Sequence, residues 1–230
     1  MNIISDSIPK LNKNKPSIIF DFDGLLVDTE IISYRIYKEI LNNYGIGFNQ
    51  KDYSEYFSGK TEEANVNNII NKYNLPLTVE EMLEKIITKE KYLHSLGVDL
   101  KRGALELLNF LNQNHYKISI ASSSTKNRAI KILKDNNIYN LFNIFVFAEN
   151  INKSKPDPEI FLKACELMKE KPNNCIVLED SEAGIEAANN ANIDVICIPD
   201  MKRPDDNHLS KTLKVFDSLH EVIDFLKRFS

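Results

Sequence analysis

Residues 18–24 read IIFDFDG, and this stretch predicts a buried strand that ends in a pair of aspartates. We expect the strand over residues 16–22. Because strand side chains alternate between faces, Asp21 and Asp23 project to one side while Phe22 turns toward the core. Two neighbouring carboxylates repel each other unless a cation lies between them. The stretch therefore indicates either an acidic turn or a site for a divalent metal ion.

Short apolar runs alternate with helical patterns after residue 98. Strands are expected at 116–121, 144–147, 175–178 and 195–198, and helices at 103–112, 126–136, 157–168, 182–190 and 218–229. Such alternation is typical of parallel strand–helix–strand units with helices on both faces of the sheet. The predicted fold class is α/β, a doubly wound parallel sheet.

Residues 31–97 carry helical spacing and no strand pattern, which predicts an all-helical domain inserted just after the first strand. The clearest helical segments are 31–44, 64–73 and 79–96. The expected organisation is a polar, flexible leader over 1–15, an α/β core over 16–30 plus 98–230, and a helical cap over 31–97.

The composition is that of an ordinary globular protein, with 43% hydrophobic and 27% charged residues in 230. A net charge of -4 without a basic stripe argues against a nucleic-acid partner. Cys165, Cys175 and Cys197 fall in apolar patterns, so buried free thiols in a reducing compartment are expected. We find no apolar stretch of signal-peptide or membrane-spanning length. A cytoplasmic monomer with no membrane partner is the expectation.

Polar side chains follow successive strands of the predicted sheet, and ligands of such sheets bind beyond the carboxyl ends of the strands. They are Asp21, Asp23, Ser122, Ser123, Ser124, Glu179, Asp180 and Ser181, with Lys155 on a nearby loop. Taken singly, each is explained by helix capping or a solvated loop. Together they match phosphoryl transfer to a carboxylate, which needs oxygen ligands for Mg²⁺, a cation and hydroxyl donors around one phosphate.

Four motifs in order carry a family resemblance. IIFDFDGLLVDTE, SIASSS, KSKPDPEIF and VLEDSEAGIEAA resemble the four motifs of the haloacid dehalogenase-like superfamily, over residues 17–200. The helical insert resembles the cap of the branch that contains β-phosphoglucomutase and phosphatases of sugar and nucleotide phosphates, including pseudouridine 5′-phosphate. The resemblance implies a Mg²⁺ cofactor and a small phosphorylated metabolite as substrate.

The resemblance also implies residue roles. Asp21 would be the nucleophile and Asp23 the general acid and base. Mg²⁺ would be bound by the Asp21 carboxylate, the Asp23 backbone carbonyl and Asp180, with Glu179 beside or behind the metal site. Ser122 and Lys155 would hold the phosphoryl group. The residues assigned to substrate binding are Gly24, Ser123, Glu30, Ser33 and Lys60.

Two departures favour simple hydrolysis. Ser33 stands where β-phosphoglucomutases carry a histidine, and residues 58–62 lack the arginine that grips a second phosphate. The leading hypothesis is a phosphatase that forms an aspartyl-phosphate. A β-phosphoglucomutase-like phosphotransferase is the alternative. A non-catalytic phospho-acceptor or binding domain is a third hypothesis, although such a domain has no need of a cap or of Asp23.

Overall fold

The computed structural model describes residues 15–58 and 62–229. Within them, six parallel strands form one sheet in the order β3-β2-β1-β4-β5-β6. The strands are β1 (Ser17–Phe20), β2 (Ile118–Ala121), β3 (Ile144–Val146), β4 (Cys175–Glu179), β5 (Asp194–Cys197) and β6 (Lys214–Val215). The first strand lies at the centre, between β2 and β4, so its carboxyl end opens at the point where the strand order reverses.

Side chains of β1 alternate between two hydrophobic clusters, one on each face of the sheet. Ile18 and Phe20 join the cluster that includes α5 (Ala104–Gln113), α6 (Lys126–Asp135) and α10 (Leu219–Leu226). Ile19 joins the opposite cluster, formed with the two helices that contact β2 to β5, namely α7 (Glu159–Met168) and α8 (Glu182–Asn190). Both faces are therefore covered, as a parallel sheet requires.

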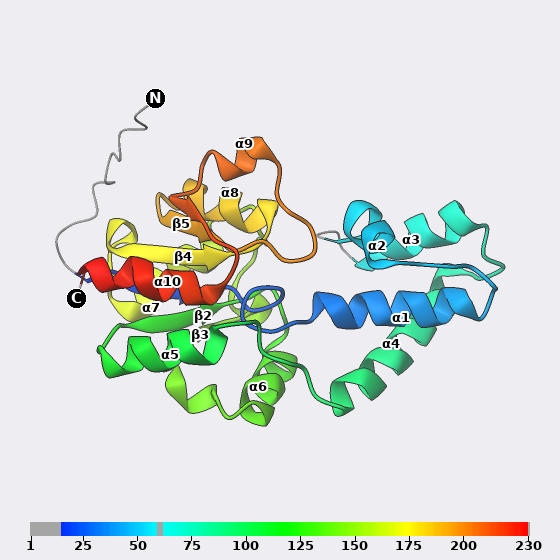
Figure 1. Ribbon diagram of the computed structural model, residues 1–230, viewed down its shortest axis with the longest axis horizontal. Helices are drawn as coiled ribbons and strands as arrows, with labels where there is room; N and C mark the ends of the chain where they lie inside the picture. Colours follow the sequence, from blue (N-terminus) through cyan, green and yellow to red (C-terminus); the bar gives the residue numbers. More distant parts are fainter. Residues whose placement is uncertain (1–14, 59–61, 230) are drawn as a thin grey trace.

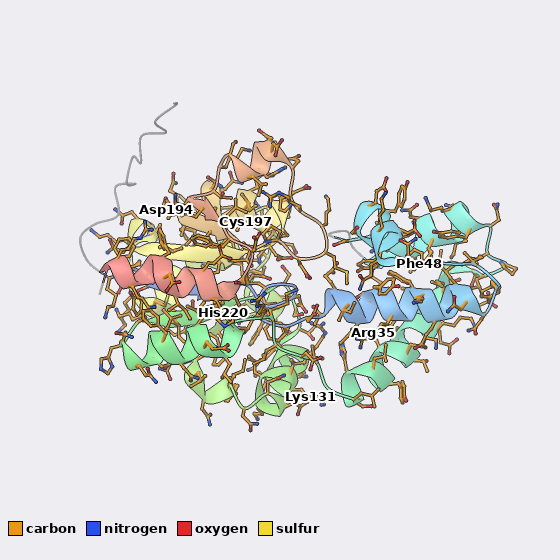
Figure 2. The ribbon with its side chains drawn as sticks, in the orientation of Figure 1. Arg35, Phe48, Lys131, Asp194, Cys197 and His220 are labelled. Carbon is orange, nitrogen blue, oxygen red and sulfur yellow. The ribbon has the colours of Figure 1, made fainter. Side chains whose placement is uncertain are left out.

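Helices α1 to α4 lie together at one side of the sheet, on the right of Figure 1, and we call residues 30–95 the helical lobe. Its helices are α1 (Glu30–Asn42), α2 (Gln50–Tyr56), α3 (Glu62–Tyr73) and α4 (Val79–Ser95). Stacked and edge-on rings fill its centre, with Phe48 (labelled in Figure 2) against Tyr34, Phe57 and Tyr73.

The chain passes between sheet and lobe twice, and the two passages pair with each other. Val27 and Leu100 form an antiparallel bridge, while Asp28 N donates to Asp99 O at 2.8 Å. Lys101 N donates to Leu26 O at 3.0 Å. The lobe is thus joined to the sheet by a short two-stranded ribbon.

The expected fold class is confirmed, with differences at some boundaries. β1 ends two residues before the expected limit because the backbone turns at Gly24, whose φ is +80°, and Leu26 N and Val27 N both donate to Phe22 O. Neither α9 (Asp206–Leu209) nor β6 was expected from sequence.

Other expectations have different outcomes. The three cysteines are free and buried, as predicted, and Figure 2 labels Cys197 on β5. The leader expected over 1–15 lies outside the described residues except for Lys15, whose Nζ donates to Asn114 O at 2.6 Å. Among the helices in the described ranges, none has the length and apolar character needed to cross a bilayer.

Candidate active site

Lys155 joins the ends of β1 and β4. Its Nζ donates to Asp21 Oδ1 at 2.5 Å and to Glu179 Oε1 at 2.7 Å, and the side chains of all three residues are almost fully buried. Burial alone would lower the pKa of Lys155, but the charges of Asp21 and Glu179 outweigh it and raise the pKa. Lys155 is therefore a fixed positive charge beside the predicted nucleophile.

Glu179 is held from both sides. Its Oε2 accepts hydrogen bonds from the backbone N–H groups of Asp180 and Ser181, each at 2.8 Å, and from Ser181 Oγ at 2.9 Å. Gly184 makes room for this carboxylate, because a Cβ there would lie 1.7 Å from Glu179 Oε1. Burial would raise the pKa of Glu179, yet Lys155 and the Ser181 donors outweigh it and lower the pKa. The side chain thus positions Lys155 and the β4–α8 turn.

Carboxylate oxygens of Asp21, Glu179 and Asp180 lie within 4.8 Å of one another. Burial raises the pKa of Asp21 to about 7 although Lys155 opposes it, and burial with the charges of Glu179 and Asp21 raises the pKa of Asp180 well above its usual value. Gly24 permits this crowding, since a Cβ there would lie 2.5 Å from Asp180 Oδ2. Buried oxygen donors with excess negative charge form a group that suits a hard divalent cation.

Asp23 is held by residues from the next strand and helix. Ser124 Oγ donates to Asp23 Oδ2 at 2.5 Å, and Arg128 Nη1 donates to Asp23 Oδ1 at 2.8 Å. Arg128 also contacts Ser124 Oγ, and its Nε lies 3.7 Å from Glu90 Oε1 on α4 of the lobe. Sequence reasoning missed Arg128. The available signal was its spacing of four residues from Ser124 at the start of the expected helix 126–136.

A cavity of about 520 Å³ lies between the sheet and the lobe. Its walls include Asp21, Asp23, Ser122, Ser123, Lys155 and Asp180. Ser122 is buried, and its Oγ accepts a hydrogen bond from Ser124 N at 3.0 Å. The structure therefore brings the predicted core residues to one place, with Gly24 beside Asp180.

The three lobe residues predicted to bind substrate have different outcomes. Glu30 lines this cavity, and its Oε2 accepts a hydrogen bond from Ser58 Oγ at 2.6 Å. Ser33 lies instead on the wall of a smaller cavity inside the lobe. Lys60 lies outside the described residues, so its predicted role in substrate binding stays a prediction.

Asp200 is a second residue that sequence reasoning did not assign to the site. It follows β5, and its Oδ1 accepts a hydrogen bond from Lys101 Nζ at 2.5 Å. Its Oδ2 is buried and has no hydrogen-bond partner in the described part of the chain. Burial raises the pKa of Asp200, and its charge contributes to the raised pKa of Asp180. The strand-end rule that found Asp180 applies equally to Asp200.

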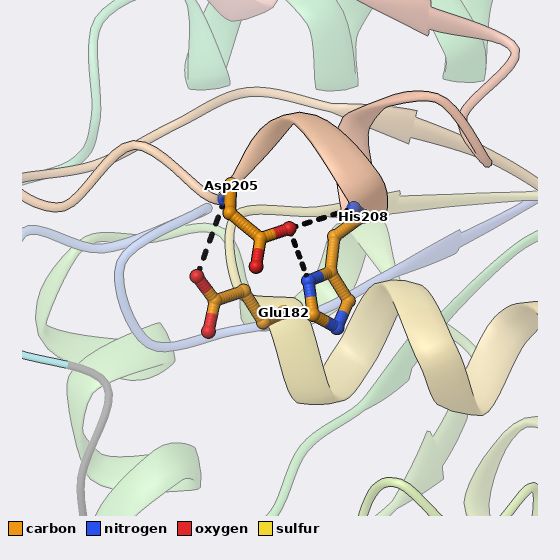
Figure 3. Close-up of side chains that lie close together, drawn as sticks. All are labelled: Glu182, Asp205 and His208. Atoms are coloured by element: carbon orange, nitrogen blue, oxygen red, sulfur yellow. Dashed lines mark hydrogen bonds and ion pairs between the residues drawn. The ribbon is translucent and has the colours of Figure 1, made fainter.

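Glu182, Asp205 and His208 form another group of closely spaced donor atoms, shown in Figure 3. Asp205 Oδ1 accepts hydrogen bonds from His208 N at 2.8 Å and pairs with His208 Nδ1 at 2.6 Å, while Glu182 accepts from Asp205 N at 3.2 Å. Lys202 Nζ already lies 3.0 Å from Glu182 Oε1. Capping of α9 and an ion pair account for these contacts, and we assign the group no catalytic role.

A family model described as haloacid dehalogenase-like hydrolase matches residues 18–198. The chain belongs to this family. The match contains all four motifs, so the predicted family is confirmed, and with it the expectation of an enzyme of the hydrolase class. The hypothesis of a non-catalytic domain loses its support.

Curated relatives of this haloacid dehalogenase-like hydrolase include a phosphorylated carbohydrates phosphatase of Thermotoga maritima, 28% identical over 78% of this chain and 83% of the relative. A β-phosphoglucomutase of Bacillus subtilis is 33% identical over 76% of this chain and 79% of its own. The solved structure of a HAD-family hydrolase from Deinococcus radiodurans, with bound phosphate and sodium, superposes with a TM-score of 0.83 at 22% identity. That match covers 95% of this chain and 97% of the other, and it supports the fold.

Proposed function

We propose that this protein is a Mg²⁺-dependent phosphomonoesterase that acts on a small phosphorylated metabolite through an aspartyl-phosphate on Asp21. The contact of Lys155 with Asp21 and Glu179, in a cavity shared with Ser122 and Asp180, is the observation that carries the proposal. It supplies a carboxylate nucleophile with a fixed cation beside it, which is the combination needed to attack a negatively charged phosphorus centre.

The first step transfers the phosphoryl group to Asp21. An Asp21 carboxylate oxygen attacks phosphorus, and the bond from phosphorus to the leaving oxygen breaks. Lys155 and the Ser122 hydroxyl bind the phosphoryl oxygens and stabilise the charge on them. Asp23 gives a proton to the leaving alcohol, so that it departs neutral.

The second step releases phosphate. Asp23, now ionised, takes a proton from a water molecule whose oxygen attacks the phosphorus, and the acyl-phosphate bond breaks to regenerate Asp21 with inorganic phosphate. Arg128 and Ser124 hold both oxygens of Asp23 and so fix the direction in which it exchanges protons.

The acidic group at the strand ends fits Mg²⁺. Asp21, Asp180 and the backbone carbonyl of Asp23 would hold the ion, while Glu179 is already engaged by Lys155 and Ser181. When bound, Mg²⁺ would neutralise phosphoryl oxygens and offset the charges of Glu179 and Asp21 that, together with burial, raise the pKa of Asp180.

We also propose that the helical lobe acts as a cap over the catalytic cavity, with a core over 16–30 and 98–230 and a cap over 31–97. Closure would exclude bulk water from the reacting phosphate.

The proposal keeps the sequence expectation of a cytoplasmic monomer with neither nucleic acid nor membrane as a partner. The net charge of -4 supports the absence of a nucleic-acid partner, and the three free cysteines suit a reducing compartment.

Phosphate release from a panel of sugar, polyol and nucleotide monophosphates, with Mg²⁺ present, tests the proposal. Wild-type protein should release phosphate from at least one of them, and Asp21→Asn should lose the activity while keeping its thermal unfolding profile. An Asp21→Asn variant with full activity would remove the nucleophile from the proposal.

A mutase is the second candidate, because a relative that is 33% identical is named β-phosphoglucomutase. The same protein should then convert β-glucose 1-phosphate to the 6-phosphate without net phosphate release. Measurement of both products in one reaction separates the two candidates.

A further inference from the structure

A second, smaller cavity of about 110 Å³ lies inside the helical lobe and meets the catalytic cavity at one residue. Glu30, at the start of α1, lines both cavities. Glu90 of α4 also lines the small cavity, and its Oε1 lies 3.7 Å from Nε of Arg128, whose Nη1 binds Asp23. The small cavity is therefore connected at two places to the predicted catalytic machinery, and it is not an isolated void.

Its position matches the place of the leaving group. Under the proposed function Asp23 protonates the leaving oxygen, so the organic part of the substrate begins beside Asp23 and extends away from Lys155. Arg128 contacts both Asp23 and Glu90, a residue of the small cavity, and Glu30 borders both cavities.

The walls of the small cavity are rich in hydrogen-bond acceptors. Glu30, Glu62 and Glu90 all line it, and none of its described lining residues is basic. Asn65 adds an amide oxygen that is buried and has no partner within residues 15–58 and 62–229. Burial raises the pKa of Glu62, and the nearby charge of Glu90 raises it further, so these carboxylates act on each other. Glu30 already accepts a hydrogen bond from Ser58, so a guest that donates hydrogen bonds would chiefly satisfy the Asn65 oxygen and reduce the repulsion between Glu62 and Glu90.

We propose that this cavity holds the leaving group, and that its acidic walls select one that donates hydrogen bonds and carries no negative charge, such as a small polyol or amino alcohol. The inference rests on the proposed function and adds the substrate class. A carboxylate or a second phosphate on the leaving group would face the negative charges of three glutamates at the cavity wall. A cavity of about 110 Å³ has room for only a few heavy atoms, which favours small leaving groups.

Three phosphomonoesters of similar size test the selection: glycerol 3-phosphate, 2-aminoethyl phosphate and 2-phosphoglycolate. We expect kcat/KM for the carboxylate-bearing 2-phosphoglycolate to be lower than for the other two by about tenfold or more. Glu62→Gln keeps the side-chain shape and removes one charge, so it should narrow this difference several-fold. Glu63→Gln, at the next and likewise exposed position of α3, is the matched control because Glu63 does not line the cavity, and it should leave the ratio unchanged.

The outcomes distinguish failure of the acidic selection from failure of the proposed phosphatase activity. If 2-phosphoglycolate reacts as fast as the other two, or if both glutamine variants change the ratio equally, the acidic selection is wrong while the phosphatase stands. If the wild-type protein releases phosphate neither from these three compounds nor from p-nitrophenyl phosphate, the proposed function is wrong. The inference about the leaving group is then wrong as well, because it rests on that function.

Discussion

Arg128 Nη1 lies 2.8 Å from Asp23 Oδ1, which ties the predicted acid and base to helix α6. The same guanidinium reaches Glu90 on the helical lobe through its Nε, at 3.7 Å. A planar fork of donors can hold a carboxylate and a second partner at fixed angles, whereas an ammonium group cannot. Arg128 is thus placed to position Asp23 and to link that position to the lobe.

We expect Arg128→Lys to keep the charge and still lower kcat by about ten- to a hundredfold with little change in KM, because Asp23 would lose its fixed orientation. Steady-state kinetics on any accepted substrate measures this. Lys131→Ala is the control, since Lys131 lies one turn further along α6 and pairs with Asp135 at 2.5 Å. Wild-type kcat in Arg128→Lys would show that Asp23 needs no such support.

Asp180 should destabilise the protein when no metal is bound. Burial and the neighbouring carboxylates raise its pKa, so its charge at neutral pH costs folding free energy. We expect Asp180→Asn to unfold at a temperature higher by a few degrees in EDTA. In saturating Mg²⁺ the order should reverse, because binding to the native state stabilises wild type by about 2.7 kcal/mol at a hundred times Kd. If Mg²⁺ raised the unfolding temperatures of wild type and Asp180→Asn equally, the result would argue against Asp180 as a ligand.

Glu30 gives a pH-dependent prediction. Burial raises its pKa above the ordinary 4.5, although the Ser58 hydroxyl opposes the shift. A carboxyl with a raised pKa favours the folded state only while it is protonated, so its contribution is lost as the pH rises through the folded pKa. Glu30→Gln should therefore unfold a few degrees above wild type at pH 7.5, and the difference should vanish below about pH 4. If the higher unfolding temperature of Glu30→Gln persisted unchanged at low pH, ionisation of Glu30 could not be its cause.

Gly184→Ala should test the close approach of Glu179 to α8. The added Cβ would lie 1.7 Å from a carboxylate that Lys155 and the Ser181 donors hold in place. We expect a loss of about 1–3 kcal/mol in the free energy of unfolding, measured in urea, together with reduced activity. Gly47→Ala is the matched control, because nothing lies within 4 Å of a Cβ built there. Similar losses in both variants would point to backbone effects instead.

Much of the sheet and of its candidate site could be predicted from the apolar pattern of the sequence and from the rule that ligands bind beyond the carboxyl ends of parallel strands. The apolar runs locate the strands because a parallel sheet is buried on both faces, and parallel strands bring their carboxyl ends to a common edge. Asp21, Ser122 and Asp180 were found in this way, and all three line the same cavity. Lys155 follows no strand directly and was included because it lies on the loop after the expected strand 144–147.

What the sequence did not reveal depends on packing between distant elements. Arg128 acts from a helix that follows β2, and its spacing from Ser124, the one local signal, does not predict the contact with Asp23 after β1. The lobe cavity needs α1, α3 and α4 in their final arrangement before Glu30, Glu62 and Glu90 face one space. The two-residue strand β6 and the four-residue helix α9 are too short to produce a periodic signal.

The pairing of Val27 with Leu100 has a consequence for how this chain can vary. Both crossings leave and re-enter the sheet at neighbouring points, so a tight turn of about two to five residues could close the gap if everything between them were deleted. The region from 28 to 99 is in this sense a removable module. Because Glu30 and Ser58 of this region line the large cavity, we expect exchange of the module for another insert to change the lobe-side wall and leave Asp21, Ser122 and Asp180 in place.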